Sequence, residues 1–335
     1  MKKQTQRSTN PYPYSDSNKR YQTYDYYTRH TFGGKCARVP LDAGFTCPNK
    51  DGTCGRGGCI FCFGGSAAAA PGTLREQYDR AVEIALRKWE PVGYIPYLQA
   101  NSNTYAPAET LRRVYAEAAA LPDSVMLCIA TRADCLGEDV LEEIARISET
   151  IPVTVELGLQ SSSDETARRI CRGYDFDVFL SGYERLRTLG DRVGVGIHII
   201  NGLPGERYEN MITTACDVAA LHPNQLKIHL LNVLRGTVLA EMYVAGRYVP
   251  MELDEYVATV CDQLELMPPD VVIARVTGDS EAEHLLAPMW ARRKTEVSNM
   301  IDKELFARSS WQGKRYIGTN EEIKQYGCEK ELNPD

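Results

Sequence analysis

The chain has 335 residues, of which 43% are hydrophobic and 25% are charged, and its formal net charge is −7 at pH 7. This composition is typical of a globular protein, and the length allows one sizeable hydrophobic core. An acidic balance does not favour a nucleic-acid partner, because phosphate contacts usually recruit a surplus of Lys and Arg. No apolar run approaches the roughly 20 residues that span a bilayer, and the first residues lack the apolar core of a signal peptide. We therefore expect a cytoplasmic protein with no membrane partner.

The chain begins with a polar stretch, residues 1–20, that predicts a mobile tail. Residues 21–27 contain four tyrosines, and we expect this segment to anchor or cover the domain. A first strand is expected over residues 38–45. Beyond it, the apolar pattern alternates between the strand period and the helix period. The expected strands are 92–99, 124–130, 153–159, 193–200, 225–231 and 271–276, and the expected helices are 74–89, 108–120, 138–147, 164–171, 178–189, 211–221 and 254–267, with a further polar helix after the last strand.

Six or seven strands separated by helices predict a parallel sheet covered by helices. Periodicity alone leaves two architectures open, a doubly wound open sheet and a curved, incomplete barrel. Polar stretches recur at the ends of successive strands, and the carboxyl ends of barrel strands converge on one site.

A loop rich in cysteine and glycine follows the first expected strand. Cys47, Cys59 and Cys62 have the spacing C-x11-C-x2-C, and the glycines between them let a backbone wrap closely around a bulky group. Three nearby thiols can bind zinc, hold an iron–sulfur cluster or serve as small buried side chains. Structural zinc needs four nitrogen or sulfur ligands, and the five histidines all lie outside this loop, so a closed zinc site is disfavoured. A four-iron cluster held by three thiolates would leave one iron open to a small molecule.

The run CIFC, residues 59–62, resembles the end of the cysteine motif of the radical S-adenosylmethionine (SAM) superfamily. The usual spacing in that superfamily is C-x3-C-x2-C, so the first gap is longer here. The stretch CPNKDGTCGRGGCIFC resembles the YhcC-like bacterial family, which is related to the catalytic subunit of the elongator complex. The resemblance implies that Cys47, Cys59 and Cys62 bind a [4Fe-4S] cluster. From the residues alone, Cys54 and Cys59 would be an alternative first pair of ligands, but Cys47 matches the resemblance.

The resemblance also implies a fold. Radical SAM proteins have an incomplete (β/α)6 TIM-like barrel, and we expect this α/β core domain over residues 21–270. The mobile tail would precede it, and residues 271–335 would form a C-terminal extension that packs on the barrel.

Polar motifs at the ends of the expected strands resemble those that hold SAM in this superfamily. TRAD after the third strand is similar to the T-R-P-D of the elongator subunit, VELGLQS to its V-E-L-G-x-Q-S, and ICRGY to its I-N-R-G-H. A polar stretch, QANSN, follows the second strand, and a GLPG turn follows the fifth. Lys227 and His229 alternate onto one face of the sixth strand and could reach substrate or SAM. The resemblance implies cofactor contacts by Phe61, Gln99, Asn101, Asn103, Thr131, Arg132, Glu156, Gln160, Arg172, His198, Gly202 and Pro204.

Several of these residues have a structural alternative. QANSN could be an ordinary polar turn. A glutamate on a buried strand is costly unless it is paired or solvated, so Glu156 could instead form a salt bridge with Arg132 or Arg172. His198 could be a hydrogen-bonded core residue.

The resemblance implies an enzyme that cleaves SAM reductively and yields a 5′-deoxyadenosyl radical, which abstracts hydrogen from an unidentified substrate. Its partner would be an electron donor of the flavodoxin or ferredoxin type. The elongator subunit acts on wobble uridines of transfer RNA, so tRNA modification is one hypothesis, and a small metabolite or a protein substrate is the other. A non-catalytic zinc or iron–sulfur module is the alternative outside enzymology. A basic cluster near the C-terminal end supports RNA binding or forms a solvated helix face; its members are Arg292, Arg293, Lys294, Arg308, Lys314 and Arg315.

Overall fold

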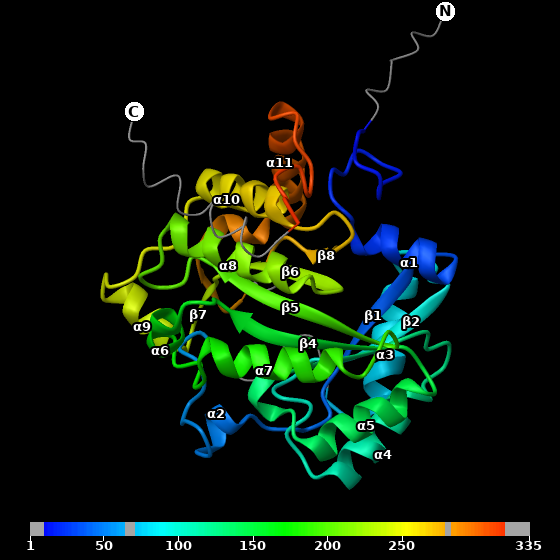
Figure 1. The fold of residues 1–335 in the computed structure, drawn as a ribbon. Helices are drawn as coiled ribbons and strands as arrows, with labels where there is room; N and C mark the ends of the chain where they lie inside the picture. The colour runs from blue at the N-terminus through cyan, green and yellow to red at the C-terminus, as the bar shows by residue number, and fades with distance from the viewer. Residues whose placement is uncertain (1–9, 64–70, 279–282, 319–335) are drawn as a thin grey trace, which may run out of the picture.

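The computed structural model describes residues 10–63, 71–278 and 283–318, which fold around one seven-stranded parallel sheet. Its strands follow one another in chain order, except that β8 takes the place beside β6 because β7 belongs to a small separate sheet. A doubly wound sheet reverses its strand order part-way, so the consecutive order excludes that alternative. The sheet curls into an open barrel (Figure 1). Its strands are β1 (Cys36–Leu41), β2 (Gly93–Leu98), β3 (Leu127–Thr131), β4 (Val153–Gln160), β5 (Val193–Asn201), β6 (Gln225–Leu230) and β8 (Val272–Arg275).

Helices cover the outer side of the sheet (Figure 1). They bury one apolar face, as α5 does with Val140, Ile144 and Ile147 at helical spacing. The longer helices are α3 (Leu74–Leu86), α4 (Ala108–Ala119), α5 (Glu138–Ser148), α7 (Phe176–Arg187), α8 (Tyr208–Leu221), α10 (Leu253–Leu266) and α11 (Lys294–Ala307). Shorter elements are α1 (Tyr24–Phe32), α2 (Pro48–Asp51), α6 (Asp164–Arg169), α9 (Val238–Val244), the 3-10 turns η1 (Ala133–Cys135) and η2 (Met289–Arg292), and the antiparallel pair β7 (Val233–Leu234) and β9 (Leu285–Ala287). None of the helices in the part of the chain that the structure describes has the length and apolar character to cross a membrane.

Alternation along the strands separates the hydrophobic core from the barrel interior. In β4, Val155 and Leu157 belong to the large core, whereas Glu156 between them lines a cavity. Arg38 of β1 and Lys227 of β6 also line that cavity. The core therefore lies between sheet and helices, and the interior is left for polar side chains.

The predicted order of strands and helices is confirmed, with differences at element ends. The first strand ends at Leu41 rather than at residue 45, because the buried Gln77 takes the chain out of the sheet by accepting the Asp42 N–H at 2.8 Å. The helix α1 was not predicted, although Thr23 caps its start and Gly33 ends it with φ +77°.

The tyrosine-rich segment closes the barrel at its amino end. Tyr24 and Phe32 of α1 pack against Cys36, Ile95 and Cys128 near the starts of β1, β2 and β3. The cysteine loop, which contains α2, lies far from α1 in Figure 1, because it follows the carboxyl end of β1. The predicted cover is thus on the side opposite the cysteines.

Part of the predicted tail packs on the C-terminal region. Tyr12 is buried and its hydroxyl donates to the Pro269 carbonyl at 2.5 Å. Lys19 forms an ion pair with Asp302 of α11 at 2.6 Å. Residues 10–20 therefore make specific contacts, and residues 1–9 lie outside the described residues. The domain boundaries stay a prediction.

Candidate active site

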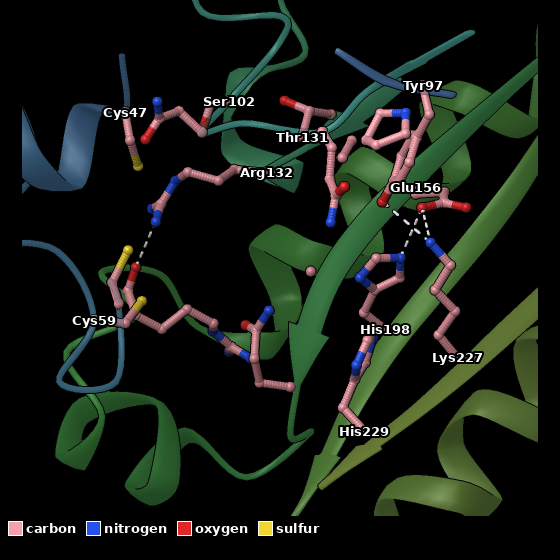
Figure 2. A pocket seen from close by; sticks show the side chains of 18 of the residues that line it. Cys47, Cys59, Tyr97, Ser102, Thr131, Arg132, Glu156, His198, Lys227 and His229 are labelled. Atoms are coloured by element: carbon pink, nitrogen blue, oxygen red, sulfur yellow. Dashed lines mark hydrogen bonds and ion pairs between the residues drawn. The ribbon is translucent and has the colours of Figure 1, made fainter. Parts of the chain in front are cut away.

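One cavity, of about 470 Å³, opens at the carboxyl ends of the strands. Figure 2 shows Cys47 and Cys59 at one end of it and Lys227 and His229 at the other. It brings together eleven of the predicted site residues, Cys47, Cys59, Cys62, Gln99, Asn101, Thr131, Arg132, Glu156, Gln160, Arg172 and His198. Most of the strand-end motifs therefore converge on one site.

Backbone hydrogen bonds tie the cysteine loop to the barrel. The Ser102 N–H donates to the Thr46 carbonyl at 3.1 Å. The Ile60 N–H donates to the Ile170 carbonyl at 3.1 Å, and the Ile60 carbonyl accepts the Leu239 N–H at 2.9 Å. The segment that carries the last two cysteines is thereby held on both sides.

Three free thiols face the cavity at this end. Cys47, Cys59 and Cys62 all line it, and the Asn49 side-chain nitrogen lies 3.6 Å from the Cys59 sulfur. Burial, together with the neighbouring thiols of Cys62 and Cys47, raises the pKa of Cys59 to about 12. Cys54 is exposed and lines a separate depression on the surface. The cavity thus takes in Cys47, not Cys54, as the companion of the closely spaced pair.

Two arginines lie beside the cysteines. Arg132 is held by both carboxylate oxygens of Asp134, at 2.9 and 2.7 Å. Arg172 is fully buried, and its Nη1 donates to the carbonyls of Leu159 and Ser161 at the end of β4. The Arg172 Nη2 is buried and has no hydrogen-bond partner among the described residues. An unpaired buried donor on a cavity wall indicates a place for a polar ligand group.

Strained backbone also gathers at the cavity mouth. Asn101 and Gln160 adopt left-handed conformations, with φ +61° and +62°. The Asn101 side chain donates to the Phe45 carbonyl at 2.9 Å and accepts from Lys50 Nζ at 2.7 Å. The register of β4 against β5 shifts between Gly158 and Gln160. Such outliers cluster where a backbone is shaped for a ligand.

A group of charged residues fills the deep end of the cavity and centres on Glu156. One oxygen of its carboxylate accepts from Arg38 Nη1 at 2.7 Å, and the other accepts from Lys227 Nζ at 2.5 Å and His198 Nε2 at 2.9 Å (Figure 2). The rings of His198 and His229 lie 5.2 Å apart. We call Arg38, Glu156, His198, Lys227 and His229 the floor cluster.

The floor cluster has one carboxylate and two cations. Burial opposes the charge of Glu156, but Lys227 and Arg38 hold the pKa of its carboxyl group well below the ordinary value. Burial lowers the pKa of Lys227 to about 8, although Glu156 raises it. Burial and the charge of Lys227 lower the pKa of His198 to about 4. Burial likewise lowers the pKa of His229. Both histidines are therefore neutral at pH 7.

The partners of Glu156 are not the arginines suggested by the sequence. Arg132 and Arg172 lie on the segments that follow β3 and β4 and are engaged there. Arg38 and Lys227 lie on β1 and β6, and the curl of the sheet brings them to Glu156. Glu156 therefore forms a buried salt bridge with partners other than those expected, and its role as a SAM contact stays a prediction.

Four predicted contacts lie outside the cavity lining. Phe61 packs against the smaller hydrophobic cluster around Ile60, and Asn103 is buried and donates to three backbone carbonyls. The Gly202 and Pro204 carbonyls accept from side chains outside the cavity. These four residues support the walls, and their role as SAM contacts stays a prediction.

Arg38 and Tyr97 are among the residues of the site that sequence reasoning missed. Arg38 is a charged residue in the mostly buried strand β1. A charged residue in an apolar strand is the same sequence pattern that singled out Glu156. Tyr97 of β2 accepts a hydrogen bond from Lys227 at 3.1 Å. A tyrosine on an apolar strand carries no such signal, so only the structure identifies it.

Comparison with known proteins decides the family. Residues 52–215 match the radical SAM superfamily, and residues 223–307 match the radical SAM C-terminal domain. YtqA of Bacillus subtilis is 43% identical over 317 residues, which cover 93% of this chain and 98% of YtqA. This chain belongs to the radical SAM superfamily. YhcC of Escherichia coli is 34% identical over 277 residues, covering 82% of this chain and 88% of YhcC, so the resemblance to the YhcC-like family is confirmed.

More distant relatives agree. The radical SAM protein matches a tRNA uridine(34) acetyltransferase of Methanocaldococcus jannaschii with 29% identity over 161 residues, 47% of this chain and 29% of that protein. The solved structure of Elp3 from Methanocaldococcus infernus superposes with a TM-score of 0.63 at 18% identity, covering 83% of this chain and 64% of that one. This likeness confirms the incomplete barrel. The protein is a radical SAM enzyme.

The residues present fit the cofactors that the superfamily implies, a [4Fe-4S] cluster and SAM. Three half-buried thiols and an unpaired Arg172 donor share one cavity, and ligation by the thiols would release their protons. Within the described ranges, no group of three or more His, Cys, Asp or Glu side chains is placed to hold a single metal ion. A four-iron cluster is larger than one ion, so its ligands need not converge on one point.

Proposed function

We propose that this radical SAM enzyme cleaves SAM reductively at a [4Fe-4S] cluster bound by Cys47, Cys59 and Cys62. The main support is that these three thiols share one end of a cavity that many polar and charged side chains line. Three thiolates leave one iron without a protein ligand, and we assign that position to the amino and carboxylate groups of SAM.

A [4Fe-4S] cluster held by these cysteines would supply the one-electron reduction that splits SAM into methionine and a 5′-deoxyadenosyl radical, and this radical would take a hydrogen atom from the substrate. The protein residues bind and orient SAM and keep water away. The unpaired Arg172 Nη2 and the side chains at the strand ends supply hydrogen bonds to SAM. An electron donor of the flavodoxin or ferredoxin type would reduce the cluster. The proposed SAM contacts inside the cavity are Gln99, Asn101, Thr131, Arg132, Gln160 and Arg172.

The test is anaerobic reconstitution with iron and sulfide, reduction in the presence of SAM, and measurement of 5′-deoxyadenosine. We expect the wild-type protein to release it and Cys59→Ala to lose at least about 100-fold of this activity, because a cluster ligand is missing. Cys54→Ala is the matched control, since Cys54 lies in the same loop but is exposed and outside the cavity. Stoichiometric zinc with no SAM cleavage in the wild-type protein would instead support the non-catalytic module.

RNA is one candidate substrate, supported by the similarity to a tRNA uridine(34) acetyltransferase. The basic cluster near the C-terminal end adds little support, because acidic neighbours compensate its charges. Arg308 pairs with Asp262 at 2.8 Å, and Arg315 pairs with Glu265 at 3.4 Å. Arg293 likewise has an acidic partner one helical turn away, in α11.

Filter binding to transfer RNA at several salt concentrations distinguishes an RNA substrate from a small metabolite or a protein. An enzyme that holds RNA through phosphate contacts should lose affinity steeply as salt rises. The absence of salt-dependent binding would contradict the RNA hypothesis and favour a small metabolite or a protein.

A further inference from the structure

The floor cluster has a positive charge that nothing within the cluster balances. Glu156 is the single carboxylate of the cluster, and it faces Arg38 and Lys227. His198 and His229 are neutral at pH 7, so the cluster carries a net charge of about +1. An uncompensated charge in a buried site is costly unless a ligand or solvent compensates it.

The floor cluster also has unused hydrogen-bonding capacity. The Lys227 ammonium has three hydrogens, and Glu156 and Tyr97 take two of them. Arg38 Nε and His229 Nε2 are buried and have no hydrogen-bond partner among the described residues. The Arg38 Nε–H and the third Lys227 hydrogen are unpaired donors beside an excess positive charge, and these are the features of a site for an oxyanion.

SAM itself does not supply this oxyanion. Its only anionic group is the carboxylate, which the proposed function places on the cluster iron at the cysteine end. The adenosine part of SAM is neutral. Figure 2 shows Lys227 and His229 across the cavity from Cys47 and Cys59, so a negative charge at the floor has to come from another molecule.

We propose that the floor cluster binds an anionic group of the substrate, a carboxylate or a phosphate, through Lys227 and Arg38. This inference rests on the proposed function, because it names the substrate class of the same site. Glu156 is then a positioning residue: it fixes Arg38 and Lys227 through its two oxygens and lowers the net charge, so that one anionic group suffices. His198 holds the same carboxylate from the side of β5.

The proposal is tested by calorimetric titration of the full chain with acetate and with inorganic phosphate at constant ionic strength, in the presence and absence of SAM. These two probes distinguish a carboxylate site from a phosphate site. Lys227→Gln should lower the affinity for the preferred probe about tenfold, because the substitution removes one charged hydrogen bond. Arg38 still pairs with Glu156 in this variant. Lys227→Arg should restore the affinity.

Lys303→Gln is the matched control, because Lys303 is exposed on α11 and outside the cavity. Equal affinities of Lys227→Gln and Lys303→Gln would overturn the proposal. Competition between the probe and SAM would also overturn it, since the floor would then be the site of the SAM carboxylate. Release of 5′-deoxyadenosine without substrate, measured on the same variants, tests the proposed function separately. An enzyme that cleaves SAM but binds neither probe would refute the anion site alone.

Discussion

The two ends of the cavity are built in different ways. At the cysteine end, one continuous loop supplies Cys47, Cys59 and Cys62. At the floor, the charged side chains come one by one from β1, β4, β5 and β6, and pairing of strands across the barrel brings them together. A local motif thus defines the proposed cofactor end, whereas the proposed substrate end depends on the whole sheet. Substrate preference can therefore change by single substitutions on strands without altering the cysteine motif.

Because the floor cluster consists of buried charges from several strands, we expect a substitution in it to lower the stability of the fold strongly. Glu156→Leu leaves Arg38 and Lys227 buried without a carboxylate, which should lower the free energy of unfolding by about 3–5 kcal/mol. Glu143→Leu is the matched control. Glu143 is just as deeply buried, but its partner Arg112 is half exposed and can return to water, so the loss should be about 1 kcal/mol or less. Denaturant unfolding measures both, and equal losses would contradict the cluster's role as a buried charge network.

Two neighbouring glycines of the cysteine loop provide a matched pair of substitutions at the cysteine end of the cavity. Gly57 and Gly58 both have positive φ, +84° and +81°. Substitution by alanine at either position should therefore cost roughly 1–2 kcal/mol of backbone strain. A methyl group at Gly58 would lie 3.2 Å from Lys50 and 3.4 Å from the Cys62 side chain, whereas at Gly57 it meets nothing within 4 Å. Gly58→Ala should therefore retain about tenfold less iron per chain than Gly57→Ala after reconstitution and desalting. The same iron content in both would mean that the cysteine position tolerates this displacement.

The smallest expected effect is a pH dependence of anion binding. Lys227, with its pKa lowered to about 8 by burial, is charged at pH 7 and mostly neutral at pH 9. Affinity for the preferred anion probe should therefore fall roughly fivefold between these pH values. In Lys227→Arg the fall should disappear, because a guanidinium stays charged in this range. A fall that persists in that variant would assign the titration to another group. The groups that face Lys227 across the cavity, and that this comparison leaves unchanged, are Arg38, Tyr97, Glu156, His198, His229 and Arg275.

The strand–helix order could be predicted from the sequence, as could the grouping of three cysteines at one cavity, because both are encoded locally. Apolar periodicity reports each element by itself, and the run from Cys47 to Cys62 is continuous. The partners of Glu156 could not be predicted in the same way, since the position of Arg38 opposite a residue 118 positions further along depends on how far the sheet curls. The structural role of Asn103 could not be predicted either, because its motif does not report that its amide donates to three backbone carbonyls.

The central claim is that one iron of the cluster is left open by Cys47, Cys59 and Cys62 and receives SAM. Electron paramagnetic resonance of the reduced, reconstituted protein tests it directly, by comparing spectra before and after addition of SAM. The account predicts a [4Fe-4S] signal whose g values shift when SAM binds, and the loss of that signal in Cys59→Ala. A cluster signal that SAM leaves unchanged, or one that survives in Cys59→Ala, would contradict the assignment.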